Sequence, residues 1–255
     1  MKTGKKDPAL LEAEVESALR EGRPVDLEKI VDGLDPVHVY SDGLYEAALA
    51  SVPQGVPAPS RAFRFWKRAF DLFASALALA FLFLPMLAIA LAVKIDDPGG
   101  RILFVQNRMG LHGKSFRCLK FRTMKSDAPH DLSTAELSDP RKYLTRVGPF
   151  LRRFSLDELP QLWNVLKGDM SLIGPRPLVT REACNQMRLS LGVYAVRPGV
   201  SGLAQVRGRD DVYYKNKALM DAVYVKRASL FLDLDLMWQT VRCVLLREGN
   251  AAEKY

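Results

Sequence analysis

The residues best suited to chemistry lie in one short stretch, 151–178. Asp157 and Glu158 form an adjacent carboxylate pair there, Arg152 precedes them, and Arg176 follows within a Gly-Pro-Arg-Pro turn. A carboxylate that attacks a phosphoryl group must be ionised and needs cations beside it, because they offset the charge on the phosphate oxygens. Arginine suits that task, since its guanidinium is planar and always charged. The stretch indicates a phosphate-handling site whose two carboxylates could also hold Mg²⁺ shared with substrate phosphates.

The same carboxylates have a purely structural interpretation. Ser155, followed three residues later by Glu158 and then by an apolar run, fits a capping box, so both acids could simply cap a helix. Pro160 lies deeper in that helix than the first turn tolerates well, which predicts a kink or a delayed start. Because helix N-termini also favour anions such as phosphate, the local pattern leaves both interpretations open.

Three blocks of sequence together resemble the monotopic phosphoglycosyl transferases, the bacterial sugar transferase family that starts exopolysaccharide and glycan assembly. The blocks are KFRTM (120–124), SLDELPQLWNVLKGDMSLIGPRP (155–177) and PGVSGLAQVRGR (198–209). They occur in order within residues 65–242. The resemblance implies an α+β, mostly helical protein, in which a re-entrant membrane helix-break-helix and amphipathic interfacial helices surround a small cytoplasmic catalytic domain containing a β-hairpin.

The resemblance also implies a reaction. Asp157 is expected to attack the β-phosphate of a UDP-sugar, expel UMP and hold the phosphosugar covalently until undecaprenyl phosphate takes it. Glu158 is expected to position Asp157, Mg²⁺ or the acceptor, and both acids are the expected metal ligands. The resemblance places the enzyme in the bacterial inner membrane, facing the cytoplasm, with no nucleic-acid partner, and leaves a second copy or downstream glycosyltransferases open as partners. The expected substrate-binding residues are Lys120, Arg122, Arg152, Arg176, Arg207, Arg209 and Asp233.

Charge is unevenly distributed along the chain. Residues 1–60 carry a net charge of −5, and the remainder carries +13. A basic body attracts phosphate-bearing substrates, anionic lipid or nucleic acid, and charge alone does not choose among them. A non-catalytic, membrane-anchored basic module that binds lipid or nucleic acid is therefore the alternative function. The three cysteines and three histidines are scattered, which argues against a disulfide framework, a zinc site and a Ser-His-Asp triad.

Residues 69–93 are almost uninterruptedly apolar and long enough to span a bilayer. Basic residues flank both ends, which under the positive-inside rule places both ends on the cytoplasmic side. Pro85 lies within the segment, where it removes a backbone hydrogen bond and can bend a helix. We therefore expect a re-entrant segment broken at Pro85, and a kinked helix that crosses the bilayer is the alternative.

The predicted organisation has three parts: an acidic head at 1–60, a membrane-embedded part at 61–97 and a basic catalytic domain at 98–255. N-cap signals at Asp7 and Asp26 predict short helices in the head, and a proline-rich linker ends it. The head is either a dispensable extension or a regulatory or partner-binding part.

Within the catalytic domain a hairpin is expected from 102–105 and 116–121, as a lipid-facing surface or, by the resemblance, as part of the active-site floor. An amphipathic interfacial element is expected at 147–154. Helices are expected at 180–191 and, as one continuous helix, at 221–240.

Overall fold

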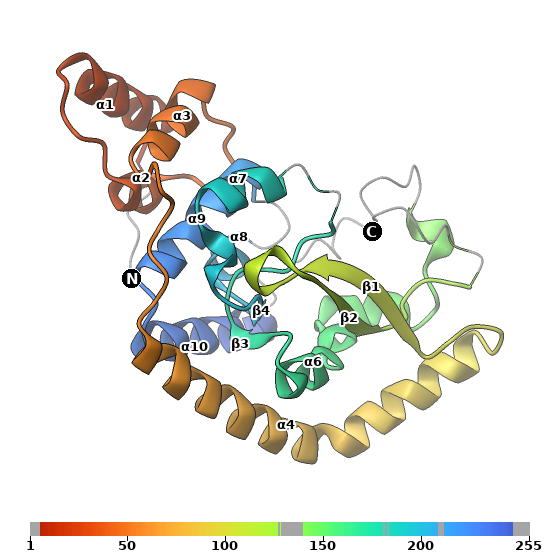
Figure 1. Cartoon of the computed structure of the whole chain (residues 1–255). Coiled ribbons are helices and arrows are strands. Elements are labelled where there is room, and N and C mark those ends of the chain that lie inside the picture. The colour runs from red at the N-terminus through yellow and green to blue at the C-terminus, as the bar shows by residue number, and fades with distance from the viewer. Residues whose placement is uncertain are drawn as a thin grey trace.

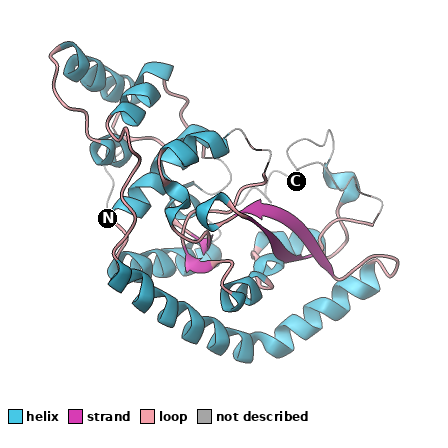
Figure 2. Ribbon diagram, viewed as in Figure 1, coloured by secondary structure: helices cyan, strands magenta, loops and turns pink. Residues whose placement is uncertain are grey.

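The computed structural model describes residues 6–126, 128, 140–180, 182, 184–208 and 212–246. Within these residues the chain is mostly helical, with a two-stranded antiparallel hairpin and a short parallel strand pair. Figure 2 shows the strands near the centre with helices around them. This arrangement agrees with the predicted α+β class.

The head contains α1 (Pro8–Arg20), α2 (Leu27–Gly33) and α3 (Asp42–Ala50). The predicted N-caps are confirmed: Asp7 accepts a hydrogen bond from Ala9 N at 2.9 Å, and Asp26 accepts one from Glu28 N at 3.0 Å. Each carboxylate satisfies an amide that has no partner within its own helix.

The head is packed onto the catalytic domain and shares its core. Buried apolar residues of α2, including Ile30 and Val31, belong to the same cluster as Leu219 and Val223 of α9 (Tyr214–Lys226). Figure 1 shows the head, in red and orange, beside α7 and α9, in teal and blue. Because this apolar surface is removed from water only while head and body stay together, the expectation of a dispensable extension does not fit the fold.

A single long helix, α4 (Arg61–Asp96), contains the predicted membrane segment. In the described part of the chain it is the one helix long and apolar enough to cross a membrane, and its apolar side chains are largely exposed. The expected break at Pro85 is absent, since the helix continues through the proline. Figure 1 shows instead that α4 follows a curved path below the rest of the molecule. Proline removes one backbone bond, which a helix can absorb by bending.

The predicted hairpin is confirmed. Strands β1 (Leu103–Met109) and β2 (Ser115–Phe121) pair antiparallel, joined by the short 3-10 turn η1 (Leu111–Gly113). Leu103 pairs with Phe121 at the open end and Met109 with Ser115 at the turn.

The stretch that carries the carboxylates is irregular. It runs through η3 (Pro140–Tyr143), α5 (Gly148–Arg153), the 3-10 turn η4 (Leu156–Glu158), α6 (Gln161–Lys167) and β3 (Ser171–Ile173). The capping-box prediction is wrong, because Ser155 has a left-handed backbone (φ 55°) and its side chain caps nothing. The delayed start is confirmed, since α6 begins only after Pro160.

The last part of the chain comprises α7 (Cys184–Ser190), η5 (Val193–Ala195), β4 (Gly199–Ser201), α8 (Leu203–Gly208), α9 and α10 (Leu230–Leu246). The expected single helix over 221–240 is wrong, because α9 ends at Lys226 and α10 begins at Leu230. Ser229 supports the restart, since its hydroxyl accepts a hydrogen bond from Leu232 N at 3.2 Å.

The glycine-rich segment lets the backbone pass close to Gly174. Strand β4 pairs with β3 in parallel. A Cβ atom on Gly199 would lie 2.1 Å from Gly174 N, and one on Gly202 would lie 2.1 Å from Gly174 O. These glycines therefore allow the backbone of β4 to reach the Gly-Pro-Arg-Pro turn.

Candidate active site

The two carboxylates of η4 have different surroundings. Glu158 Oε1 accepts hydrogen bonds from Lys120 Nζ at 2.6 Å and from Arg176 Nη2 at 3.0 Å. Within the described part of the chain, the Asp157 carboxylate accepts no side-chain hydrogen bond, although only 9% of the residue is exposed. Glu158 is therefore anchored between two cations, and Asp157 is left available for a reacting partner.

The electrostatics separate the pair further. Burial raises the pKa of Asp157 to about 6, while Lys120 and Arg152 partly oppose the rise and the Glu158 charge adds to it. Burial also acts to raise the pKa of Glu158, but Arg176 and Lys120 outweigh it and hold that pKa well below its usual range. Glu158 is thus a fixed anion, and Asp157 titrates near neutral pH.

Local packing brings η4 against β2. Asn164 on α6 bonds the edge of β2 as a neighbouring strand would: its Oδ1 accepts from Leu119 N at 3.0 Å, and its Nδ2 donates to Arg117 O at 2.8 Å. Both bonds join α6 to the backbone of β2 within three residues of Lys120. They therefore fix the position of α6 and η4 relative to that lysine.

Arg152 approaches the pair from α5. Its Nε donates to Thr123 Oγ1 at 2.9 Å, and its charge acts on Asp157 to lower the pKa of that carboxyl group. The structure therefore brings together five of the sequence-predicted site residues: Lys120, Arg152, Asp157, Glu158 and Arg176.

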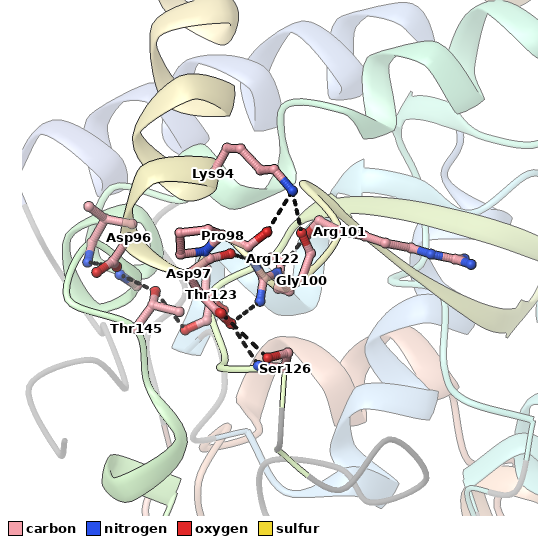
Figure 3. Close-up of polar contacts among 12 residues, drawn as sticks. Lys94, Asp96, Asp97, Pro98, Gly100, Arg101, Arg122, Thr123, Ser126 and Thr145 are labelled. Carbon is pink, nitrogen blue, oxygen red and sulfur yellow. Dashed lines mark hydrogen bonds and ion pairs between the residues drawn. The ribbon is translucent and has the colours of Figure 1, made fainter.

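Arg122, another predicted substrate-binding residue, lies away from the carboxylate pair. Its guanidinium pairs with the Asp97 carboxylate and donates to Asp97 O at 2.8 Å. Figure 3 shows it pointing toward the turn that follows α4, where Ser126 N also donates to Asp97 at 2.8 Å. Since its donors are used there, Arg122 holds the end of α4 against β2 and is not brought to the carboxylate pair.

Two other predicted substrate-binding residues are also engaged away from the pair. Arg207 donates to Val31 O at 3.0 Å and approaches Asp32 at 3.6 Å, so it ties α8 to the head. Asp233 is buried and accepts from Lys67 at 2.6 Å and from Tyr224 at 2.7 Å, so it ties α10 to α4 and α9. Arg209 lies outside the described residues.

One residue near the site was missed. Arg108 on β1 donates to Pro177 O and to Gln106 Oε1, and burial followed by the nearby Arg176 charge lowers its pKa. Strand periodicity could have found it, because Phe104 pairs with Lys120 and residues 104 and 108 lie on one face of β1. Alternation along the hairpin therefore places Arg108 on the face that carries Lys120.

The two carboxylates offer the oxygen ligands that Mg²⁺ prefers. The described residues contain no group of three or more side chains that could form a metal site by themselves. Two carboxylates fit a Mg²⁺ ion that takes its remaining ligands from water and substrate phosphates, and they do not fit a dedicated protein cage.

Comparison with known proteins gives consistent matches. The family model described as bacterial sugar transferase matches residues 62–247. The UDP-glucose:undecaprenyl-phosphate glucose-1-phosphate transferase of Caulobacter vibrioides is 42% identical over 212 residues, which cover 79% of this chain and 78% of that protein. The exopolysaccharide production protein ExoY of Rhizobium meliloti is 39% identical over 202 residues, which cover 72% of this chain and 87% of that protein.

Other relatives are longer. The undecaprenyl-phosphate galactose phosphotransferase of Salmonella typhimurium is 39% identical over 206 residues, which cover 74% of this chain and 42% of that protein. The chain spans less than half the length of this relative and of the UDP-galactose-lipid carrier transferase of Erwinia amylovora. The match of the family model over residues 62–247, together with these relatives, shows that the chain belongs to the bacterial sugar transferase family, the phosphoglycosyl transferases.

Proposed function

We propose that the protein transfers a sugar-1-phosphate from a UDP-sugar to undecaprenyl phosphate and releases UMP, as the first membrane step in the synthesis of an exopolysaccharide or related glycan. The observation that carries the proposal is the pair of unlike carboxylates: Asp157, which accepts no side-chain hydrogen bond from the described residues, beside Glu158 fixed by Lys120 and Arg176. The acceptor and the class of donor follow from the names of the relatives.

The reaction takes two displacements at one phosphorus atom. An Asp157 oxygen attacks the β-phosphorus of the UDP-sugar, the bond from that phosphorus to the bridging oxygen breaks, and UMP leaves with the electron pair. A phosphate oxygen of undecaprenyl phosphate then attacks the same phosphorus and displaces Asp157, which returns as a carboxylate. Lys120, Arg152 and Arg176 offset the charge on the phosphate oxygens in both steps.

Asp157 and Glu158 would hold Mg²⁺, which supplies further positive charge at the phosphates. Glu158 orients the site, because its bonds to Lys120 and Arg176 fix two cations whose charges also act on Asp157. Asp157 must be ionised to attack, and the neighbouring cations favour that form.

The course of α4 supports a re-entrant attachment to the cytoplasmic side of the inner membrane. Near its start, Lys67 pairs with Asp233 of α10 at 2.6 Å. At its end, the Asp96 carboxylate accepts from Val147 N at 2.9 Å, just before α5. A helix that crosses a hydrocarbon core about 30 Å thick separates its ends by the bilayer. Both ends of α4 are bonded to one folded domain, which favours entry and exit through the same leaflet.

Substitution of the nucleophile tests the proposal. Asp157→Asn should abolish UMP release from a UDP-sugar and eliminate any phosphosugar adduct trapped on the full-length protein, because an amide cannot form the acyl phosphate. The matched control is Asp42→Asn, an exposed carboxylate of the head that pairs with Lys215; it should keep full activity. Full activity in Asp157→Asn, with an intact lipid-linked product, would remove the nucleophile from the mechanism.

The alternative function is a non-catalytic basic module anchored by α4, which the exposed apolar helix and the basic body favour. That function predicts lipid binding that weakens steadily with salt and does not change in Asp157→Asn. Wild-type protein that releases no UMP from any UDP-sugar in a panel with undecaprenyl phosphate would favour this alternative.

A further inference from the structure

The backbone around Arg176 is held from outside at every carbonyl from residue 175 to residue 180. The donors come from β4, α7 and β1. The bonds run from Gly199 N to Pro175 O, from Arg188 Nη1 to Arg176 O, from Arg108 Nη1 to Pro177 O, from Met109 N to Leu178 O, and from Asn185 Nδ2 to Val179 O and Thr180 O.

This arrangement compensates for the two prolines that flank Arg176. Proline has no N–H, so residues 175 and 177 can be fixed only through their carbonyl groups. The bonds therefore set the backbone from which the Arg176 side chain reaches Glu158 at 3.0 Å.

Arg188 is the least accessible of the side chains that donate these bonds. The residue is 1% exposed and its ion-pair partner Asp221, on α9, is 0% exposed. One Nη atom of Arg188 pairs with the Asp221 carboxylate, and the other donates to Arg176 O at 2.7 Å. Asp221 thus fixes the direction in which the planar guanidinium presents its second donor.

A buried ion pair contributes little to stability by itself, because the cost of removing both charges from water offsets their attraction. Placement of a neighbouring group is a task for which the planar guanidinium is better suited, because one Nη atom pairs with Asp221 while the other donates to the Arg176 carbonyl. The group that Arg188 contacts is the carbonyl of Arg176, one of the two cations bonded to Glu158.

We propose that Arg188, oriented by Asp221, is a positioning residue for the transfer reaction, which acts through the backbone of Arg176 to set the geometry of Arg176 and Glu158. The inference rests on the proposed function. It adds to that function a residue pair that lies behind the site and touches no substrate.

The test is a double-mutant cycle on the full-length protein. Arg188→Lys keeps a charge for Asp221 but cannot make both bonds, so we expect kcat for UMP release to fall roughly 10- to 100-fold, as for a misplacement of about 1 Å. If Arg188 acts only through Arg176, Arg188→Lys should cost nothing further in the Arg176→Gln background, because the group that it positions is already gone.

Arg188→Lys can also destabilise a buried site, so a second variant and a control accompany it. Asp221→Asn retains the shape and one acceptor oxygen, and should lower kcat less than Arg188→Lys does, again with no further loss beside Arg176→Gln. The control is Arg227→Lys, which alters an ion pair with Asp32 and Glu28 far along the chain from the turn; it should leave kcat unchanged. Thermal melting identifies variants whose fold is intact.

Two results would overturn the inference. One is wild-type kcat in a folded Arg188→Lys or Asp221→Asn variant. The other is a double variant in which the reductions in kcat caused by Arg188→Lys and by Arg176→Gln multiply, as they do for independent residues. Both differ from failure of the proposed function, in which wild-type protein itself releases no UMP.

Discussion

At the scale of single residues, adjacent carboxylates differ because their neighbours differ. Glu158 lies between Lys120 and Arg176, which keep it ionised, whereas Asp157 has no side-chain partner in the described chain and carries a pKa of about 6. A weakly held carboxylate of this kind is a better nucleophile than one fixed in two ion pairs. The division of roles is therefore set by the environment and not by the type of residue.

This difference predicts the pH dependence of the reaction. Because the proposed reaction requires Asp157 in its ionised form, the rate of UMP release should fall as the pH is lowered through about 6. Values of kcat/KM for the UDP-sugar between pH 4.5 and pH 8.5, at Mg²⁺ concentrations below saturation, would check it, because kcat/KM reports the ionisation of the free enzyme. A rate that stays flat to pH 5 would contradict the assignment.

A charge variant makes that measurement specific. Lys120 lowers the pKa of Asp157. Lys120→Met should therefore shift the pH at which the rate falls to a higher value, and it should also reduce the rate itself. Lys114→Met serves as the matched control, because Lys114 is an exposed lysine just before β2; it should leave the pH dependence of the rate unchanged.

At the scale of elements, the site depends on short segments that other elements hold in place. η4 and α6 are too short to be stable alone, and Asn164 fastens α6 to the edge of β2 through both of its polar atoms. The Arg176 turn depends in the same way on donors from α7, β1 and β4. Precision at this site comes from side-chain bonds to backbone groups.

Asn164→Ala should test that dependence. The substitution leaves the Leu119 amide and the Arg117 carbonyl without their partners, so we expect a loss of about 2–3 kcal/mol in the free energy of unfolding. Thermal melting in detergent would measure it against Asn107→Ala, an exposed asparagine of β1. Equal melting temperatures for the two variants would show that the bonds to β2 do not hold α6.

At the scale of the whole molecule, one folded body holds both ends of a long apolar helix. Lys67 and Asp96 lie near opposite ends of α4, and each is bonded to the catalytic domain. The head completes the core of that same body, where Arg227 pairs with Asp32 at 2.9 Å. The curved path of α4 in Figure 1 fits a helix that dips into a membrane and returns.

Accessibility of the two ends can be measured directly. Single cysteines introduced as Arg61→Cys and Gly99→Cys, at exposed positions before and after the apolar segment, should both react with a membrane-impermeant maleimide in inverted membrane vesicles. Neither should react in intact spheroplasts. Labelling of the two positions from opposite sides would establish a helix that crosses the bilayer.

The sequence by itself determined what local rules control. The acid pair, the apolar segment, the N-caps at Asp7 and Asp26, the hairpin and the delayed start at Pro160 all depend on single continuous stretches of sequence. Only the tertiary structure decided which charges meet. Lys120 and Arg176 reach Glu158 from 38 and 18 positions away, whereas Arg207 bonds a carbonyl 176 positions away in the head. The continuity of α4 through Pro85 was also a tertiary outcome, because local rules permit either a bend or a break. Arg122, Arg207 and Asp233 stay predicted substrate-binding residues, and only the tertiary structure decided the partner of each within the fold, because a charged side chain removed from water must be paired where it lies.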